Sequence, residues 1–530
     1  VGQYPHQFSG GMRQRAVIAM AMAGRPKLII ADEPTTALDV TVQAQVLALL
    51  RRRQEATGAA VVLITHDLGV IAETAHRVAV MYAGRIVEAA PVAALFRAPR
   101  HPYTMALLQS LPRIDADQNR LVPIPGQPAS PADLPSGCPF HPRCAFAAGR
   151  ARCRTEEPVL VELGEAHAAA CHFAASLAAP AVHGIAAAAA RTMRREVAGT
   201  KLLEVADLRV HFPIRSKVLR REIGSVRAVD GVDLRLDAGE TLGLVGESGC
   251  GKTTTGRTIM GLVRATHGAI SFGGEDITNA PRRQLREVRR HMQYVFQDPY
   301  ASLNPVLSVG DIVAEPLRIH GLYDAMGGAR RVARLFEMVG LSASMMGRLP
   351  RAFSGGQKQR IGIARALALE PRMLILDEPV ASLDVSIQAQ VVNLLRDLQR
   401  ELGLGYLFIA HDLAVVRHIS DRIAVMYLGR IVEEADRDAL YGAPLHPYTQ
   451  SLLSAVPVPD PAARRAGRIV LRGEVASPAR PPPGCSFHPR CARATERCRR
   501  ERPILTAVDD AATRVACFHP GPGSVAAEAS

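Results

Sequence analysis

The sequence contains Gly246-Glu247-Ser248-Gly249-Cys250-Gly251-Lys252-Thr253, which fits the pattern G-x-x-x-x-G-K-[ST] of a phosphate-binding loop. The apolar segment 241–245 before it predicts a buried strand, and residues 254–262 predict a helix. Glycines let backbone N–H groups turn toward phosphate oxygens, and the helix N-terminus adds its positive dipole end. This context favours a nucleoside triphosphate site over a glycine-rich turn with a chance lysine.

The loop chemistry assigns roles to its last residues. Lys252 reaches the β- and γ-phosphates, and the hydroxyl of Thr253 holds Mg²⁺. We expect all eight residues of the loop, with Thr254 after them, to bind the nucleoside triphosphate. Cys250 is interpreted as a space-filling position within the loop.

Length and composition exclude some classes of protein. A chain of 530 residues predicts several domains, and no run of about twenty apolar residues predicts a membrane span. No signal peptide opens the sequence, so a cytosolic protein is expected. The net charge is +14, but the basic residues are spread along the chain with acidic residues between them. This pattern favours an arginine-rich composition over a nucleic-acid surface.

The chain is a tandem repeat with a constant offset of 345 residues. The matching segments in the first and second copies are 8–12 with 353–357, 32–34 with 377–379, 66–68 with 411–413, and 101–104 with 446–449. Residues 201–345 of the second copy, which include the phosphate loop, have no counterpart in the first. The expectation is a fragment or a mis-started reading frame, with a degenerate half-site as the alternative.

Two carboxylates end an apolar run at 373–378 in the second copy. A buried parallel strand has this composition, and acidic residues at its carboxyl end lie where α/β sheets bind ligands. Asp377 is the candidate Mg²⁺ ligand, and Glu378 is the candidate acceptor of a proton from the attacking water. His411 follows a predicted strand at 406–409, and it recurs as His66, so a γ-phosphate contact is favoured over a structural histidine.

Other elements of the second copy follow from local patterns. Strands are predicted at 202–212, 226–236, 268–272 and 289–296, the last running into Gln297. Ser354 is a good N-cap, and it predicts a helix that extends to Leu369.

This set of motifs resembles the nucleotide-binding domain of ABC transporters, an α/β fold of the P-loop NTPase class. The second copy matches the family's motifs as follows: Walker A at 246–253, the Q-loop at Gln297, the signature at 353–357, Walker B at 373–378, the D-loop at 382–384 and the switch histidine at His411. The first copy carries the signature at 8–12, Walker B at 28–33, the D-loop at 37–39 and His66. Phe8 and Phe353 replace the usual leucine, and Met12 replaces the usual glutamine.

The resemblance implies that two such domains pair head to tail around ATP. Intrachain pairing would then complete the loop at 246–253 with Ser9, Gly10 and Gly11 of the first copy. The reciprocal site would keep Ser354, Gly355 and Gly356 with Glu33 and His66, but it has no phosphate loop. Gln297 is implied both in catalysis, with Glu378 and His411, and in Mg²⁺ binding, with Thr253 and Asp377. Phe212 is the candidate that stacks on adenine.

Two groups of four cysteines follow the repeated domains. They are Cys138, Cys144, Cys153 and Cys171, and Cys485, Cys491, Cys498 and Cys517. Repeated tetrads in a cytosolic protein favour metal over disulfides, either Zn²⁺ or an iron–sulfur cluster, and the spacing does not choose between them. Eight buried free cysteines are the alternative.

The tails with these tetrads resemble the C-terminal extension of the oligopeptide/dipeptide branch of ABC importers. That branch implies [4Fe–4S] clusters, with Zn²⁺ as the second choice, and a peripheral position on the cytoplasmic face of the inner membrane. The implied partners are two membrane permease subunits and an extracytoplasmic solute-binding protein, without nucleic acid. The transported solute, dipeptide, oligopeptide, nickel or another, stays open.

The resulting tandem architecture has two ATPase domains, each followed by a cysteine-containing extension. The expected boundaries are 1–95 for a partial first ATPase domain, 96–175 for its extension, 176–199 for a linker, 200–441 for the complete second domain and 442–530 for its extension. Two rival hypotheses remain: a soluble tandem ABC ATPase acting on nucleic acid or the ribosome, and an inactive relic. The ordinary 101-residue spacing from Thr253 to Ser354 disfavours the DNA-repair members of the first class.

Overall fold

The computed structural model describes most of the chain. The described residues are 4, 8, 10–35, 38–114, 120–129, 133–164, 166–177, 200–216, 221–463, 469, 471, 473, 475–508 and 513–521. Ser9, Ala37 of the first D-loop and most of the expected linker therefore lie outside the described residues.

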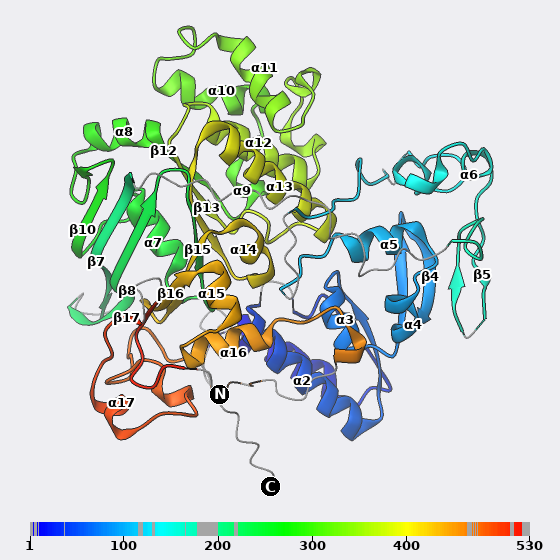
Figure 1. Ribbon diagram of the computed structural model, residues 1–530, viewed down its shortest axis with the longest axis horizontal. Coiled ribbons are helices and arrows are strands. Elements are labelled where there is room, and N and C mark those ends of the chain that lie inside the picture. The colour runs from blue at the N-terminus through cyan, green and yellow to red at the C-terminus, as the bar shows by residue number, and fades with distance from the viewer. Residues whose placement is uncertain are drawn as a thin grey trace.

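The second copy is organised around an eight-stranded sheet with the order β12-β13-β14-β9-β15-β16-β18-β17 (Figure 1). Its strands are β12 (Met292–Val295), β13 (Met373–Asp377), β14 (Gly405–Ala410), β9 (Thr241–Val245), β15 (Arg422–Tyr427), β16 (Arg430–Asp436), β18 (Thr513–Val515) and β17 (Thr506–Val508). The first five run parallel, and β13, β14 and β9 are buried along their whole length. Because parallel strands end at the same edge, the phosphate loop after β9, the carboxylates after β13 and His411 after β14 meet there.

A smaller antiparallel sheet with the order β11-β10-β7-β8 lies beside the first. It contains β7 (Lys201–Arg215), β8 (Glu222–Asp237), β10 (His267–Phe272) and β11 (Glu275–Asp276). Side chains from β7, β8 and β10 form one core cluster with α7 (Lys252–Ile259), β9 and β12. The predicted strands at 202–212, 226–236 and 268–272 are confirmed. The strand predicted at 289–296 begins only at Met292, because the preceding residues belong to helix α8 (Arg282–His291), whose arginines suit an exposed helical surface.

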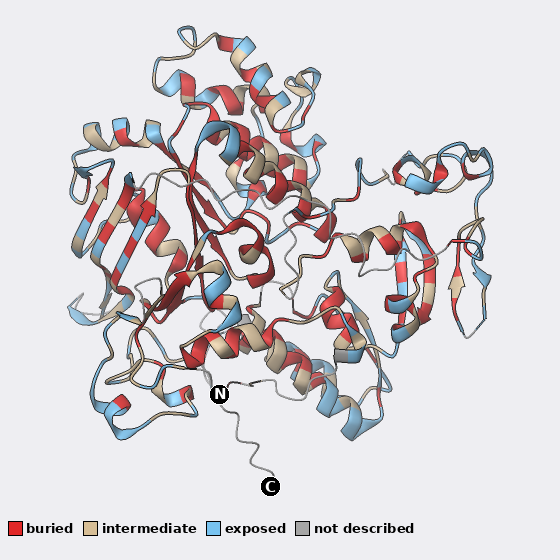
Figure 2. Cartoon of the chain, in the orientation of Figure 1, coloured by how far each residue is buried: buried red, intermediate tan, exposed pale blue. Residues whose placement is uncertain are grey.

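A helical region covers another core cluster, which packs against β13, β14 and β15 (Figure 1, Figure 2). Its helices are α9 (Pro299–Ser302), α10 (Val309–Ile319), α11 (Gly328–Met338), α12 (Gly355–Leu367), α13 (Val385–Leu402) and α14 (Leu413–Ile419). Ser354 is the N-cap of α12, as the sequence predicted, and it forms a capping box with Gln357. The helix ends two residues earlier than expected. The chain then forms α15 (Arg437–Gly442), and the extension contains α16 (Pro447–Ala455) and α17 (Glu496–Arg500).

The first copy repeats several of these elements. Its strands are β1 (Leu28–Asp32), β2 (Ala60–Ile64), β3 (Arg77–Tyr82), β4 (Arg85–Pro91), β5 (Val161–Glu162) and β6 (Ala168–Ala169). Its helices are α1 (Gly10–Met22), α2 (Val40–Thr57), α3 (Leu68–Thr74), α4 (Val92–Arg97), α5 (Pro102–Gln109) and α6 (Arg152–Thr155). β1 and β2 form a two-stranded parallel sheet, and β3, β4, β6 and β5 form a separate four-stranded sheet.

The two copies contact each other reciprocally. Gln390 of α13 donates a hydrogen bond to the carbonyl of Ile124, and the equivalent Gln45 of α2 donates to the carbonyl of Leu471, each over 3.0 Å. The segment after each ATPase region therefore packs on the helix that follows the D-loop of the other copy. Among the described residues, none of the helices combines the length and apolar composition that crossing a membrane would take.

Candidate nucleotide site

The phosphate loop leaves a fully buried strand and enters a helix, as its sequence predicts. Gly251 adopts φ 111°, and a Cβ there would lie 2.2 Å from the carbonyl oxygen of Ala228, so only glycine fits. Lys252 Nζ donates to the carbonyls of Gly246 at 2.8 Å and Glu247 at 3.1 Å. Cys250 is buried beside Gly246, consistent with the predicted space-filling role. Thr254 lies in the first turn of α7.

Thr253 and Asp377 form a compact set of oxygen donors at the start of α7. Thr253 Oγ1 donates to Asp377 Oδ1 over 2.9 Å, and the hydroxyl of Tyr294 donates to the other carboxylate oxygen over 2.7 Å. Burial raises the pKa of Asp377, although these two hydrogen bonds oppose the shift. A hydroxyl and a carboxylate are the oxygen ligands that Mg²⁺ prefers, so this donor set suits the ion that accompanies ATP.

Glu378 lies next along the chain and makes contacts with both other predicted catalytic residues. Gln297 Nε2 donates to Glu378 Oε2 over 2.7 Å, and His411 Nδ1 lies 3.3 Å from Oε1. Burial acts to raise the pKa of Glu378, but His411, Lys252 and Gln297 outweigh it and hold it below the ordinary value. Burial likewise acts to lower the pKa of His411, but Glu378 raises it overall. An ionised carboxylate held in this way is suited to accept a proton from water.

Residues of the first copy reach the phosphate loop from the start of α2. The backbone N–H of Ser248 donates to Asp39 Oδ2 over 3.4 Å, and Thr41 Oγ1 donates to Glu247 Oε1. Asp39 also caps α2 by accepting from the N–H of Val42. Among the described residues, the hydrogen bonds that join the loop to the first copy thus come from the D-loop end.

The predicted signature residues are placed in part. Ser9 lies outside the described residues, Gly10 begins α1, and Gly11 is buried against Val42. In the second copy, Gly355 and Gly356 begin α12 after the Ser354 cap. Their place opposite a phosphate group therefore stays a prediction, as does adenine stacking by Phe212, a partly exposed residue of β7 paired with Val226.

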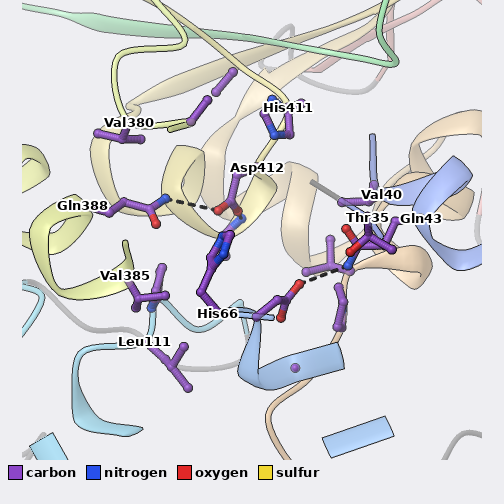
Figure 3. Close-up of a pocket in the computed structure, with 18 of the residues that line it drawn as sticks. Thr35, Val40, Gln43, His66, Leu111, Val380, Val385, Gln388, His411 and Asp412 are labelled. Atoms are coloured by element: carbon purple, nitrogen blue, oxygen red, sulfur yellow. Dashed lines mark hydrogen bonds between the residues drawn. The ribbon is translucent and has the colours of Figure 1, made fainter. Parts of the chain in front are cut away.

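A cavity of about 180 Å³ lies between the two copies, and both His66 and His411 line it (Figure 3). The side chains around it are arranged reciprocally: Gln43 donates to Asp67 over 3.0 Å, and Gln388 donates to Asp412 over 3.3 Å. Burial raises the pKa of Asp67, and the charge of Asp412 raises it further, whereas hydrogen bonds from Val70 and Gln43 oppose the shift. The equivalent ends of the two copies thus face each other.

The C-terminal extension of the second copy also contacts the loop, through residues that the sequence did not single out. Arg490 forms a bidentate pair with the Glu247 carboxylate, with distances of 2.7 and 3.1 Å, and both side chains are at most 3% exposed. The N–H of Glu247 donates to the hydroxyl of Tyr448 over 2.9 Å. The signal was present in the repeated His-Pro-Tyr-Thr and His-Pro-Arg-Cys segments, which contain these two residues.

The cysteine tetrads gather, but not as ion-binding groups. Cys485, Cys491, Cys498 and Cys517 line one small pocket of the described structure. Burial, with the other three thiols adding to it, raises the pKa of Cys517 to about 11. Burial likewise raises the pKa of Cys138, Cys144 and Cys171 in the first tetrad, and neighbouring thiols of that tetrad raise it further. Nevertheless, no three His, Cys, Asp or Glu side chains in the described ranges are placed to hold a metal ion, so the side chains as placed do not support the iron–sulfur or zinc prediction.

Comparisons with known proteins agree with this geometry. The ABC transporter family profile matches residues 1–36 and 229–381, and the profile of the oligopeptide/dipeptide transporter C-terminal region matches 87–153 and 432–498. The oligopeptide transport ATP-binding protein OppD of Mycobacterium tuberculosis is 51% identical over 469 residues, which cover 87% of this chain and 75% of OppD. The glutathione import ATP-binding protein GsiA of Escherichia coli K12 is 46% identical over 477 residues, which cover 90% of this chain and 68% of GsiA.

Proposed function

Because this chain belongs to the ABC transporter ATPases of the oligopeptide/dipeptide importer family, we propose that it hydrolyses ATP to energise peptide import through separate membrane permease subunits. One observation carries the proposal: the phosphate loop, the Thr253–Asp377 pair and the Glu378–Gln297–His411 group meet at one edge of the large sheet. The relatives named for oligopeptide and glutathione transport support peptides as the substrate class.

Each of the site residues has a separate role in the proposed hydrolysis. Lys252, now bonded to loop carbonyls, would turn to the β- and γ-phosphates of ATP. Thr253 and Asp377 would hold Mg²⁺, which neutralises charge that develops on the phosphates. Glu378 accepts a proton from the attacking water, and the Gln297 and His411 contacts fix its carboxylate for that step.

Pairing of the two copies within one chain is part of the proposal. The Asp39 and Thr41 contacts with the loop and the shared cavity around His66 and His411 support it. In this arrangement Ser9, Gly10 and Gly11 complete the site of the second copy, because a serine-capped helix presents its positive end to the γ-phosphate. The domain boundaries given above follow from the same tandem arrangement.

The proposed partners are two permeases and an extracytoplasmic solute-binding protein, at the inner face of the membrane. Affinity purification from mild detergent extracts tests this: co-purifying permeases are the expected result. Co-purification of nucleic acid or ribosomes in their place would favour the rival class. Peptide uptake by cells that carry Glu378→Gln in place of the wild-type chain gives the functional test, and normal uptake would contradict the proposal.

The cysteine tetrads enter as a separate proposal, with [4Fe–4S] first and Zn²⁺ second. The four free thiols of the second tetrad line one small pocket, and although their placement there is not that of a metal site, four thiolates are the ligand set that such a cluster takes. Anaerobic purification with iron, sulfide and zinc analysis is the test. A brown protein with equal iron and sulfide is expected, whereas a colourless, metal-free protein would overturn this proposal and leave the ATPase proposal intact.

A further inference from the structure

Glu247 places a negative charge inside a loop whose purpose is to bind a negatively charged ligand. Its side chain is only 1% exposed, so water does not solvate it. A buried carboxylate is costly unless it is paired and hydrogen-bonded. In such a loop an unpaired carboxylate would also repel the triphosphate.

The C-terminal extension supplies the compensating charge. Arg490 ends a short 3-10 turn, His488–Arg490, between Cys485 and Cys491, and its guanidinium holds both oxygens of Glu247. A bidentate guanidinium–carboxylate pair fixes orientation as well as charge. The charge of Glu247 is thereby neutralised on the buried side of the loop.

A second contact from the same extension holds the backbone of the loop. Tyr448 accepts from the N–H of Glu247, and its ring lies 4.7 Å from the ring of Tyr427 and 5.4 Å from that of Phe487. Because Tyr448 is fully buried in this cluster, its hydroxyl has a fixed position.

The first copy contains the same cluster of rings, with a different hydrogen-bond partner for its arginine. Its rings Tyr82, Tyr103 and Phe140 repeat the spacings of 4.7, 5.3 and 5.4 Å. Arg143, the counterpart of Arg490, donates to the carbonyl of Pro125 over 2.9 Å. The ring cluster of the extension thus forms in both copies, and among the described residues the contact of its arginine with a phosphate loop is found in the second copy.

We propose that Arg490 and Tyr448 are positioning residues for ATP binding, which neutralise the Glu247 carboxylate and hold its backbone so that the phosphate loop is shaped for the triphosphate. This inference rests on the proposed function, since it assigns the extension a direct part in the ATP site. It gives the cysteine-containing extension a physical connection with nucleotide affinity.

The test measures equilibrium binding of a fluorescent ATP analogue together with ATPase KM and kcat, on the full chain. Arg490→Met should raise the dissociation constant and the KM about tenfold or more, with a smaller change in kcat, because it leaves a buried charge in the loop. Arg490→Lys should give an intermediate loss, and Tyr448→Phe a loss of a fewfold. The double variant Arg490→Met with Glu247→Gln should recover most of the affinity, because the unpaired charge is gone.

Arg143→Met is the matched control, and it should leave KM within about twofold of wild type. If Arg490→Met does not fold, Arg490→Lys and Tyr448→Phe carry the test. Unchanged KM in the folded Arg490 variants, an equal effect of Arg143→Met, or no recovery in the double variant would each overturn the inference. Failure of the wild-type chain to bind nucleotide would instead overturn the proposed function.

Discussion

In the first copy β1 pairs with β2 in the same register as β13 pairs with β14 in the second, with Asp32 opposite Ile64 and Asp377 opposite Ile409. The surroundings differ. Ile30 is 65% exposed, whereas its counterpart Ile375 is fully buried in the cluster that includes α7 and β12. Equivalent strands therefore form the same ladder in both copies, but their burial depends on elements far away in the chain.

The proposed catalytic pair of glutamate and histidine shows the same contrast in burial. His66 and Glu33 are 3.2 Å apart with both side chains about 45% exposed, whereas His411 and Glu378 are 26% and 15% exposed. Both glutamates adopt a left-handed backbone, with φ 43° and 48°. The local geometry after the strand is thus repeated, and the shielding from water that strengthens electrostatic interactions is found in the second copy.

The largest difference between the copies should appear when each glutamate is replaced. Glu378→Gln should lower kcat at least about 100-fold, because the proton acceptor beside the phosphate loop is lost. Glu33→Gln should lower kcat less than about threefold, since the Glu33 side chain is about 45% exposed and water screens its interactions. Steady-state ATPase assays check both, with nucleotide binding as the control. Equal losses of kcat in the two variants would contradict the expected difference between the two copies.

Acid should destabilise both extensions through one buried histidine in each. Burial lowers the pKa of His101 to about 4 and that of His446 to about 3. Because the folded state favours the neutral ring, stability is complete above the unfolded pKa of about 6.5 and falls as the pH drops toward these values, by about 2 kcal/mol per histidine at pH 5.

Both rings accept a hydrogen bond from the N–H two residues later, so His101→Asn and His446→Asn keep a cap without the titration. Denaturant unfolding at pH 7 and pH 5 should show a flatter pH dependence in each variant. A slope equal to that of the wild type would contradict the assignment.

The contact of the first copy with the phosphate loop can be tested with an equivalent pair of hydroxyls. Thr41→Val removes a donor to Glu247 and should raise the KM for ATP about three- to tenfold. Ser386→Ala, its counterpart, removes a bond to Asp384 within its own copy and should leave KM within about twofold. Identical kinetics of the two variants would argue against intrachain pairing.

The smallest expected effect concerns the reciprocal amide contacts between the copies. Gln45→Ala and Gln390→Ala each remove one hydrogen bond to a backbone carbonyl and should each lower the free energy of unfolding by about 1 kcal/mol. Urea denaturation measures both. A loss confined to one variant would show that the two docking surfaces are not equivalent.

Much of the nucleotide site could be predicted because its residues follow strands in the sequence. The phosphate loop, Asp377 and His411 each come directly after an apolar run, and parallel strands bring such positions to one edge. The glycine pattern was equally informative, since Gly251 needs a backbone that other residues rarely adopt. The start of β12 was predicted three residues early, because the charged helix before it ends without a sequence break.

The sequence by itself determined the phosphate loop, the tandem repeat and the identity of Glu378, since each depends on short-range pattern or on self-comparison. Only the tertiary structure decided what surrounds them. Arg490 lies 243 residues from Glu247, and Thr41 lies 206 residues from it, so no local period or motif joins them. Burial decides such pairs: a carboxylate removed from water must find a partner wherever the fold supplies one.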